Sequence, residues 1–325
     1  MLRSVWPMER VSARGLSISR FRIIAWLAFA SLYIIIVTGS LVRLTGSGLG
    51  CVDWPACNEE RFVDVSTPHA AIEQLNRLFT GVVAASVIAA MIAAFAVRPR
   101  DKRTIRLAAL LVLGVVGQVV LGGIVVLTGL HPLSNMGHFL LSIVLMTWAY
   151  WLVAHLTNQR EALPPTKRDW YNVWSFAPAF RVRTLSRIVL LFTMAAVVTG
   201  TVVTGTGPHA GDEMSPRFGF AISTVARVHG ASVIMTLSAT LVLGWFIRKA
   251  GTHRSTQNAF EAFLFLAVLQ GGIGYLQYFT GVPVVLVAIH IALSVAVWLA
   301  ALQLVARSGA SDKEALVTTA HSVAE

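Results

Sequence analysis

The feature that most constrains this sequence is a series of eight apolar segments, each close to the length of a membrane span. The segments are 22–43, 71–97, 104–129, 135–157, 184–205, 222–247, 257–280 and 283–306. About 20 apolar residues cross the hydrocarbon core of a bilayer as a helix, and a backbone in lipid must satisfy its own hydrogen bonds. The chain is also only 13% charged, whereas soluble proteins average about 25%. We therefore predict an all-α polytopic membrane protein, surrounded by membrane lipid and without a soluble domain.

Positive charge is distributed unevenly along the chain. Of the 26 Lys and Arg residues, 21 lie in alternate connections or at the ends: five up to Arg22, five in 98–106, six in 158–187, three in 248–254 and two after 306. Because Lys and Arg concentrate in cytoplasmic loops, we expect a plasma membrane protein with both termini in the cytoplasm. The net charge of +11 then reflects topology, and we expect no nucleic-acid partner.

The apolar segments contain an internal repeat. An offset of 152 residues relates several pairs of identical residues, among them Gln118 and Gln270, Thr128 and Thr280, and His138 and His290. Each repeat is four segments long, so we predict two parallel four-helix bundles related by a pseudo-twofold axis along the membrane normal. The predicted parts are a cytoplasmic N-terminal segment 1–21, a first bundle 22–157, a cytoplasmic linker 158–183, a second bundle 184–306 and a cytoplasmic tail 307–325.

Two histidines in the second half are candidate metal ligands. His229 and His290 lie at similar depth in two segments of one predicted bundle. Polar residues in membrane spans are costly and are candidates for function, and facing side chains inside a four-helix bundle commonly hold a cofactor. Two imidazoles without a cysteine suit the two axial positions of a haem iron, while zinc or copper normally needs more ligands. For either residue alone, a neutral histidine that hydrogen-bonds to a neighbouring helix is the alternative.

The first half departs from this pattern. His138 corresponds to His290 in the repeat, but Asn76 occupies the position of His229. Glu73 lies about one helical turn before Asn76 and shares its face. We therefore predict a site with room for a reactant in the first half and a closed, six-coordinate site in the second. The alternative for Glu73 is a carboxylate favoured near the start of its helix by the helix dipole.

Two arginines lie beside the proposed sites, Arg77 in the first half and Arg227 in the second. A guanidinium group matches the shape of a carboxylate, so both are candidate partners for haem propionates. The alternative is that their charged ends extend to the membrane surface.

The two cysteines of the chain, Cys51 and Cys57, lie in the first outer loop. Disulfides persist outside the cytoplasm, so we predict a Cys51–Cys57 disulfide bond. Such a pair is either structural or a labile redox pair.

These residues together resemble the haem A synthase family over roughly residues 22–306. The resemblance rests on the loop motif Thr45-Gly-Ser-Gly-Leu-Gly-Cys-Val-Asp-Trp-Pro-Ala-Cys57, on the following Glu73-x-x-Asn76-Arg77, on the eight segments and on the placement of the histidines. It implies the eight-helix fold inferred above. It also implies an oxidoreductase that oxidises a ring methyl group of haem O, by successive hydroxylation, to the formyl group of haem A for terminal oxidases.

The resemblance further implies roles for individual residues. His229 and His290 would ligate a haem b cofactor, and the N-terminal half would take the substrate haem. There Glu73 would be an essential catalytic carboxylate and His138 a ligand of the substrate iron. Many members have a histidine at the position of Asn76, and asparagine is a poor iron ligand, so binding of the substrate haem by two histidines does not carry over to this chain. Two nearby loop histidines could substitute: His69 and His209.

Two other classes of protein remain as alternatives. A membrane b-type dihaem electron-transfer protein predicts two equivalent two-histidine sites, and Asn76 and Glu73 argue against it. A transporter built from repeats predicts broken helices and charged residues near the bilayer midplane, of which the sequence shows no clear set. As partners of a haem A synthase we expect haem O as substrate, haem O synthase and an electron donor.

Overall fold

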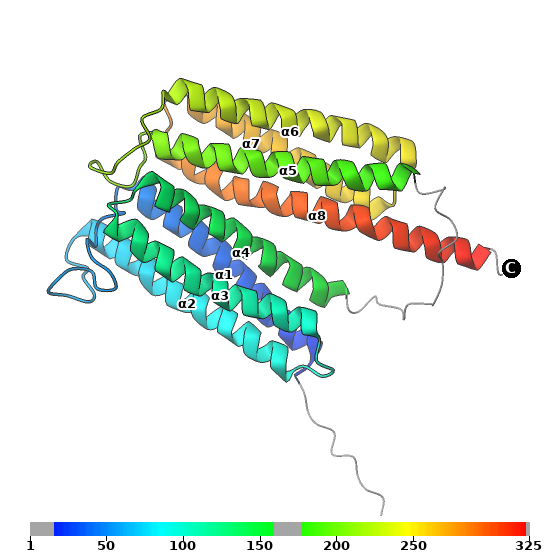
Figure 1. Ribbon diagram of the computed structural model, residues 1–325, viewed down its shortest axis with the longest axis horizontal. Coiled ribbons are helices and arrows are strands. Elements are labelled where there is room, and N and C mark those ends of the chain that lie inside the picture. Colours follow the sequence, from blue (N-terminus) through cyan, green and yellow to red (C-terminus); the bar gives the residue numbers. More distant parts are fainter. Residues whose placement is uncertain (1–15, 159–176, 323–325) are drawn as a thin grey trace, which may run out of the picture.

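The computed structural model describes residues 16–158 and 177–322 of the chain, and these residues form eight long helices (Figure 1). The helices are α1 Ile18–Leu44, α2 Pro68–Ala96, α3 Lys102–Leu127, α4 Pro132–Asn158, α5 Ala177–Thr206, α6 Ile222–Ala250, α7 Arg254–Phe279 and α8 Val284–Ser322. Each contains a stretch that is long and apolar enough to cross a membrane. The predicted all-α architecture with eight spans is therefore confirmed.

Polar side chains set several helix starts a few residues outside the apolar segments. α2 begins after Thr67, whose Oγ1 accepts the N–H of Ala70 at 3.1 Å. α3 begins after Asp101, whose carboxylate accepts the N–H of Thr104 at 3.0 Å. These caps satisfy N–H groups that have no acceptor within the helix, so the helices extend into the polar boundary of the membrane.

Helix also occupies parts of the predicted linker and tail. α5 begins at Ala177, where Pro178 suits the first turn of a helix, and α8 continues past residue 306 to Ser322. The remaining linker residues 159–176 lie outside the described residues, as do 1–15 of the predicted N-terminal segment and 323–325 of the tail.

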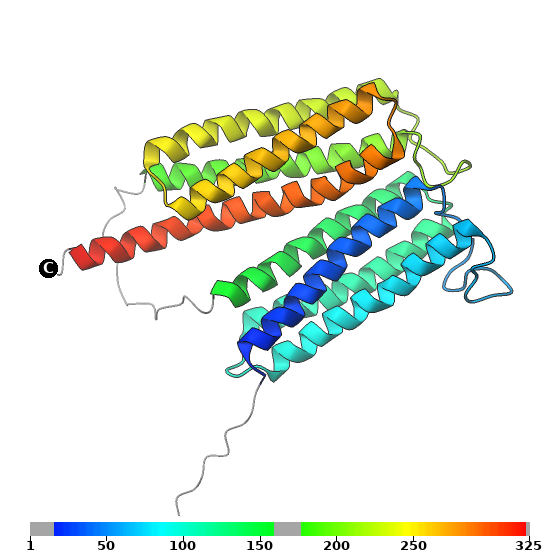
Figure 2. The same ribbon diagram turned by 180° about the vertical axis from the view of Figure 1, so that it is seen from behind.

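The helices form two groups of four, which Figures 1 and 2 show from opposite sides. In the first group α1 packs on α2, α2 on α3, α3 on α4 and α4 on α1, and α5 to α8 repeat this order. The backbones of helices on the diagonals lie further apart: in the described residues no Cα pair within 8 Å joins α2 to α4 or α6 to α8. Any contact across these diagonals is therefore made by side chains.

The two groups join through α1, α4, α5 and α8. α1 packs on α8, α4 on α5, and α4 on α8. Exchanging the groups, so that α1 takes the place of α5 and α4 that of α8, leaves this set of contacts unchanged. Trp298 Nε1 donates a hydrogen bond to Thr147 Oγ1 at 2.8 Å across the junction, and Tyr33 Oη donates one to the Ala292 carbonyl at 3.0 Å. The symmetric set of helix contacts supports the predicted pseudo-twofold relation, which remains a prediction.

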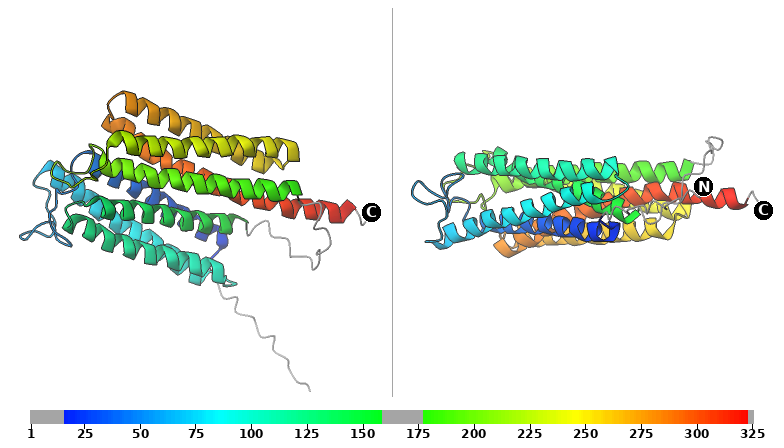
Figure 3. Two further views of the ribbon diagram at one scale, coloured as in Figure 1. Left: turned by 45° about the horizontal axis from the view of Figure 1, so that its top comes forward. Right: turned by 90° about the horizontal axis from the view of Figure 1, so that it is seen from below.

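The long loops 45–67 and 207–221 and the turns after α3 and α7 lie at one end of the molecule, opposite the start of α1 and the end of α8 (Figure 3). The turns after α3 and α7 share one conformation. Leu130 and Val282, which are 152 residues apart, both have positive φ, at 62° and 59°. Positive φ is uncommon for residues other than glycine, so its recurrence at the repeat offset shows that both halves use the same turn. Which end faces the cytoplasm remains a prediction.

Candidate functional site

His229 of α6 and His290 of α8 face each other across the diagonal of the second group. Their ring centres are 6.5 Å apart and the ring planes are inclined by 80°. An imidazole nitrogen binds a transition metal at about 2 Å and the ring centre lies roughly 1 Å further away, so two rings on opposite sides of one metal have centres about 6 Å apart. The two rings therefore have the spacing that an iron held between them requires.

Neighbouring side chains orient the His229 ring. Its Nδ1 lies 3.2 Å from Thr199 Oγ1 of α5, which in turn lies 3.0 Å from Ser232 Oγ. A partner on Nδ1 leaves Nε2 as the nitrogen that can bind a metal. The ring also packs on Gly200, where an added Cβ would stand 3.2 Å from His229 Cε1.

His290 and its repeat counterpart His138 have matching surroundings. Gln270 and Gln118 each donate a hydrogen bond of 3.0 Å to the main-chain carbonyl of the respective histidine. The Nδ1 atoms of both histidines are buried without a partner among the described residues. An unpaired buried polar atom costs about 1–3 kcal/mol, so stability alone does not account for a histidine at either position.

Asn76 stands in the first half where His229 stands in the second. Thr38 Oγ1 lies 2.8 Å from Asn76 Oδ1, as Thr199 Oγ1 lies beside His229. An added Cβ at Gly39, the residue after Thr38, would stand 3.7 Å from Asn76 Nδ2. The side-chain frame of the second site is thus retained around a residue that ligates iron poorly.

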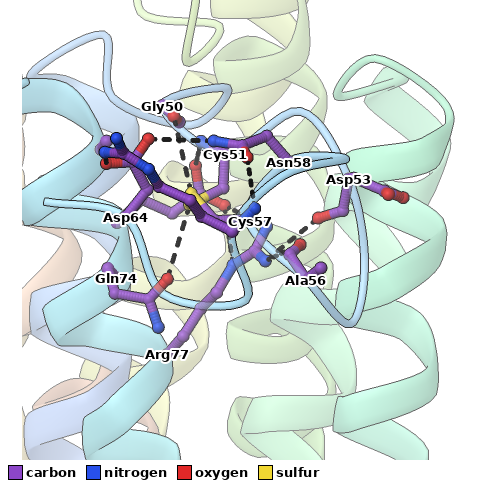
Figure 4. The surroundings of a disulfide bond; sticks show 12 residues. Gly50, Cys51, Asp53, Ala56, Cys57, Asn58, Asp64, Gln74 and Arg77 are labelled. Atoms are coloured by element: carbon purple, nitrogen blue, oxygen red, sulfur yellow. Dashed lines mark hydrogen bonds and ion pairs between the residues drawn. A yellow bond between two sulfur atoms is a disulfide. The ribbon is translucent and has the colours of Figure 1, made fainter. Parts of the chain in front are cut away.

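Glu73 and Arg77 hold the disulfide loop on the end of α2. Figure 4 shows Arg77 beside the loop that carries Cys51 and Cys57. The Glu73 carboxylate is buried and accepts the N–H of Cys51 at 2.7 Å and the Arg77 Nη2 and Nε groups at 2.7 and 3.0 Å. Arg77 Nη1 donates to the carbonyls of Asp53 and Ala56, each at 3.1 Å. This network is not among the features predicted from the sequence, although the spacing of four between Glu73 and Arg77 is that of a helical ion pair.

The predicted Cys51–Cys57 disulfide is present, with an S–S distance of 2.02 Å, and is confirmed. Both cysteines have 0% of their surface exposed. Thiol–disulfide exchange needs access to a sulfur atom, so in this conformation the bond acts as a structural link of the loop.

The other predicted cations and loop histidines lie at the same end of the molecule. Arg227 is exposed and makes no hydrogen bond or ion pair with the rest of the described chain. His69 Nδ1 lies 2.8 Å from Ser47 Oγ, and His209 Nε2 donates to the Val282 carbonyl at 2.8 Å. These contacts tie both histidines to the loops at this end.

Bare metal ions have no comparable site in the part of the chain that the structure describes, because no three His, Cys, Asp or Glu side chains converge there. A zinc or copper ion normally takes more than two protein ligands. The facing pair His229 and His290 therefore fits a haem iron, whose other four ligands come from the porphyrin.

Comparison with known proteins gives one consistent result. Residues 22–68 and 61–302 match the COX15-CtaA family, described as cytochrome oxidase assembly protein. Among curated relatives, "Heme A synthase" of Geobacillus kaustophilus (strain HTA426) is 31% identical over 153 residues, or 45% of each chain. The protein of the same name from Bacillus pumilus (strain SAFR-032) is 33% identical over 113 residues, or 34% of this chain and 36% of the relative. The matched region thus spans less than half the length of either relative. The family match covers nearly all of the described helices, and the chain belongs to the COX15-CtaA family of cytochrome oxidase assembly proteins.

Proposed function

We propose that this chain is a haem A synthase, an oxidoreductase that converts a ring methyl group of haem O to the formyl group of haem A. The observation that carries the proposal is the difference between two sites built on one frame. The second half presents facing His229 and His290, whereas the first presents His138, Asn76 and a buried carboxylate at Glu73. Membership of the family and the printed names of its relatives support the same activity.

The second half is proposed to hold a haem b cofactor between α6 and α8. His229 and His290 are its iron ligands, and when bound it supplies electron transfer. Thr199 keeps the His229 ring in place through Nδ1. Arg227, exposed two residues before His229, is the proposed partner of a propionate, since its guanidinium has no other partner in the described residues.

The first half is proposed to bind haem O, with His138 on the substrate iron and Asn76 on the opposite side. Two successive hydroxylations, each of which removes two electrons from the methyl carbon and needs an oxygen-supplying oxidant from outside the protein, give a geminal diol, which loses water to the aldehyde. Glu73 lies one turn from Asn76 and is proposed to exchange protons with the reacting edge of the substrate. Arg77 is already bound to Glu73 and two loop carbonyls, so it supports this site through the loop.

An electron-transfer protein with two equivalent haems is the alternative function. It requires two ligating residues on each diagonal, and Asn76 does not meet that requirement. We further propose a plasma membrane location with cytoplasmic termini. We also propose two partners: haem O synthase, which would supply the lipid-soluble substrate, and an electron donor, which would supply electrons for the redox reaction.

The test is expression in cells that make haem O but have no haem A synthase of their own. Extracted pigments are separated, and the purified protein is assayed as its pyridine haemochrome. We expect haem A in the extract and haem b on the protein. Haem b without any haem A would favour the electron-transfer alternative, and a protein without haem would rule out both.

A further inference from the structure

Trp54, in the middle of the disulfide loop, packs its indole ring on the backbone of α3. An added Cβ at Gly123 would stand 2.8 Å from Trp54 Cδ2 and 3.1 Å from Cε2 and Cε3. These atoms belong to the rigid fused part of the indole, so the whole ring would have to move to make room for a methyl group. Gly123 thus leaves the space that the indole occupies.

The same part of α3 also carries the ring of His138. An added Cβ at Gly122 would stand 3.5 Å from His138 Cε1. Consecutive residues of a helix differ by about 1.5 Å in height and about 100° in direction. The indole of Trp54 and the imidazole of His138 therefore lie at nearly the same depth, on adjacent faces of α3.

The loop is fastened to α2 on both sides of Trp54. Arg77 donates to the carbonyls of Asp53 and Ala56, which bracket Trp54 and Pro55. Arg77 is the residue next to Asn76. The loop therefore runs from the Asn76 end of α2 to Gly123 of α3 and brings the indole to the part of α3 that also meets His138.

The second half has no equivalent of this contact. Tyr275 stands where Gly123 stands in the first half, at the repeat offset of 152, and 62% of its surface is exposed. Trp54 is 36% exposed, so part of its indole is covered and part of it is open. A tryptophan that only anchors a protein in the membrane interface faces lipid and needs no glycine beneath it. The indole contact is confined to the half that carries Glu73 and Asn76.

We propose that Trp54 is a substrate-positioning residue: its indole forms one wall of the first-half site and packs against the porphyrin ring of haem O. The inference rests on the proposed function. Aromatic rings pack offset or edge to face, and a flat porphyrin held from one side by His138 needs a second surface that fixes its rotation. Rotation decides which ring methyl group lies next to Glu73, so Trp54 determines which group is oxidised.

The test uses a substitution that displaces the indole without altering it. Gly123→Ala places a methyl group against Trp54, and Gly81→Ala is the matched control, because nothing lies within 4 Å of an added Cβ there. Binding is measured with metal-free haem O, whose fluorescence reports retention by the purified protein and whose binding does not depend on iron ligation. Haem A formation is measured in cells that make haem O.

We expect Gly123→Ala and Trp54→Ala each to weaken binding of metal-free haem O and to lower haem A formation by about 10- to 100-fold, the range that a misplaced substrate produces. The double variant should be no worse than Trp54→Ala alone, since the added methyl group then meets no ring. Trp54→Phe should recover most of the binding, and Gly81→Ala should match the wild type.

Three results would overturn the inference. One is unchanged binding and haem A formation in Gly123→Ala and Trp54→Ala while the wild type makes haem A, which would leave the proposed function standing. Another is a double variant in which Gly123→Ala lowers binding and haem A formation as much as it does in the wild-type background. A third is the appearance of free Cys51 and Cys57 thiols in Trp54→Ala, which would assign the loss to folding of the loop. If the wild type makes no haem A, the proposed function fails, and the binding measurement still decides whether Trp54 contacts the porphyrin.

Discussion

At the scale of single residues, the second site depends on two imidazole rings whose centres lie 6.5 Å apart. We predict that His229→Ala and His290→Ala each abolish low-spin haem b in the purified protein, because one histidine leaves an axial position open. Thr199→Val is the matched control, because it removes the hydroxyl group beside His229 Nδ1 but leaves both histidines in place. It should retain haem b with reduced occupancy, as a lost hydrogen bond costs about 1 kcal/mol. Haemochrome assays and reduced-minus-oxidised spectra measure both, and unchanged haem b in either alanine variant would contradict the ligand assignment.

Glu73 raises a question of role at the same scale, because one carboxylate both holds the loop and is proposed to exchange protons. Glu73→Gln keeps the size and an oxygen acceptor for the N–H of Cys51, but it removes the charge and the exchangeable acid. We expect haem A formation to stop and haem O or a hydroxylated intermediate to accumulate, while haem b and the disulfide are retained. Normal haem A in this variant would remove Glu73 from the mechanism.

At the scale of helices, glycines fix how closely a ring approaches its neighbour. Gly200→Ala would place a methyl group 3.2 Å from His229 Cε1, tighter than ordinary contact. An alanine in a helix is otherwise favoured over glycine by up to about 1 kcal/mol. We therefore expect lower haem b occupancy from Gly200→Ala and none of that loss from Gly272→Ala, where an added Cβ meets nothing within 4 Å. Equal haem b content in the two variants would show that the His229 ring does not depend on this contact.

The stability that helix ends contribute away from the two sites also depends measurably on pH. Asp101 caps α3 and lies 2.6 Å from His155 Nε2 of α4. Partial burial alone would raise the pKa of Asp101, but hydrogen bonds from Thr104, His155 and the backbone hold that pKa well below its ordinary value. Such a group adds stability that is complete above its unfolded pKa of about 3.9 and is lost as the pH falls through the folded pKa. We expect Asp101→Asn to lower Tm at pH 7, with a difference from wild type that narrows below about pH 4. A difference independent of pH would contradict this account.

At the scale of the whole molecule, the eight spans place the start of α1 and the end of α8 on one side. We predict that this side is cytoplasmic, because 21 of 26 Lys and Arg residues flank it. A C-terminal reporter that is active only in the cytoplasm should be active, and the same reporter inserted in loop 45–67 should be silent. The opposite pattern would overturn the orientation.

Much of this architecture follows from the sequence, and the reasons differ by feature. The spans are predictable because bilayer thickness sets their length, and His229 and His290 because two polar residues recur at matched depth. The loop contacts are not predictable in the same way. Trp54 contacts Gly123, which lies about seventy residues later in the chain. No local sequence pattern around either residue predicts this contact. The ion pair of Glu73 and Arg77 had a signal in its spacing, but its bonds to loop carbonyls depend on how the whole loop folds.

The helix contacts between the two groups stay the same when the groups are exchanged, and this symmetry has an evolutionary consequence. A surface that pairs with its own copy in this way is the isologous interface of a twofold dimer, so under the predicted pseudo-twofold relation the molecule corresponds to a duplicated and fused four-helix homodimer. In a homodimer every substitution enters both sites together, and a change that opens one site also destroys its twin. Once the two copies share a chain, one site can lose its second histidine and gain a carboxylate while the other keeps both ligands. Fusion would thus allow a pair of like sites to divide into the cofactor site and the substrate site that we propose.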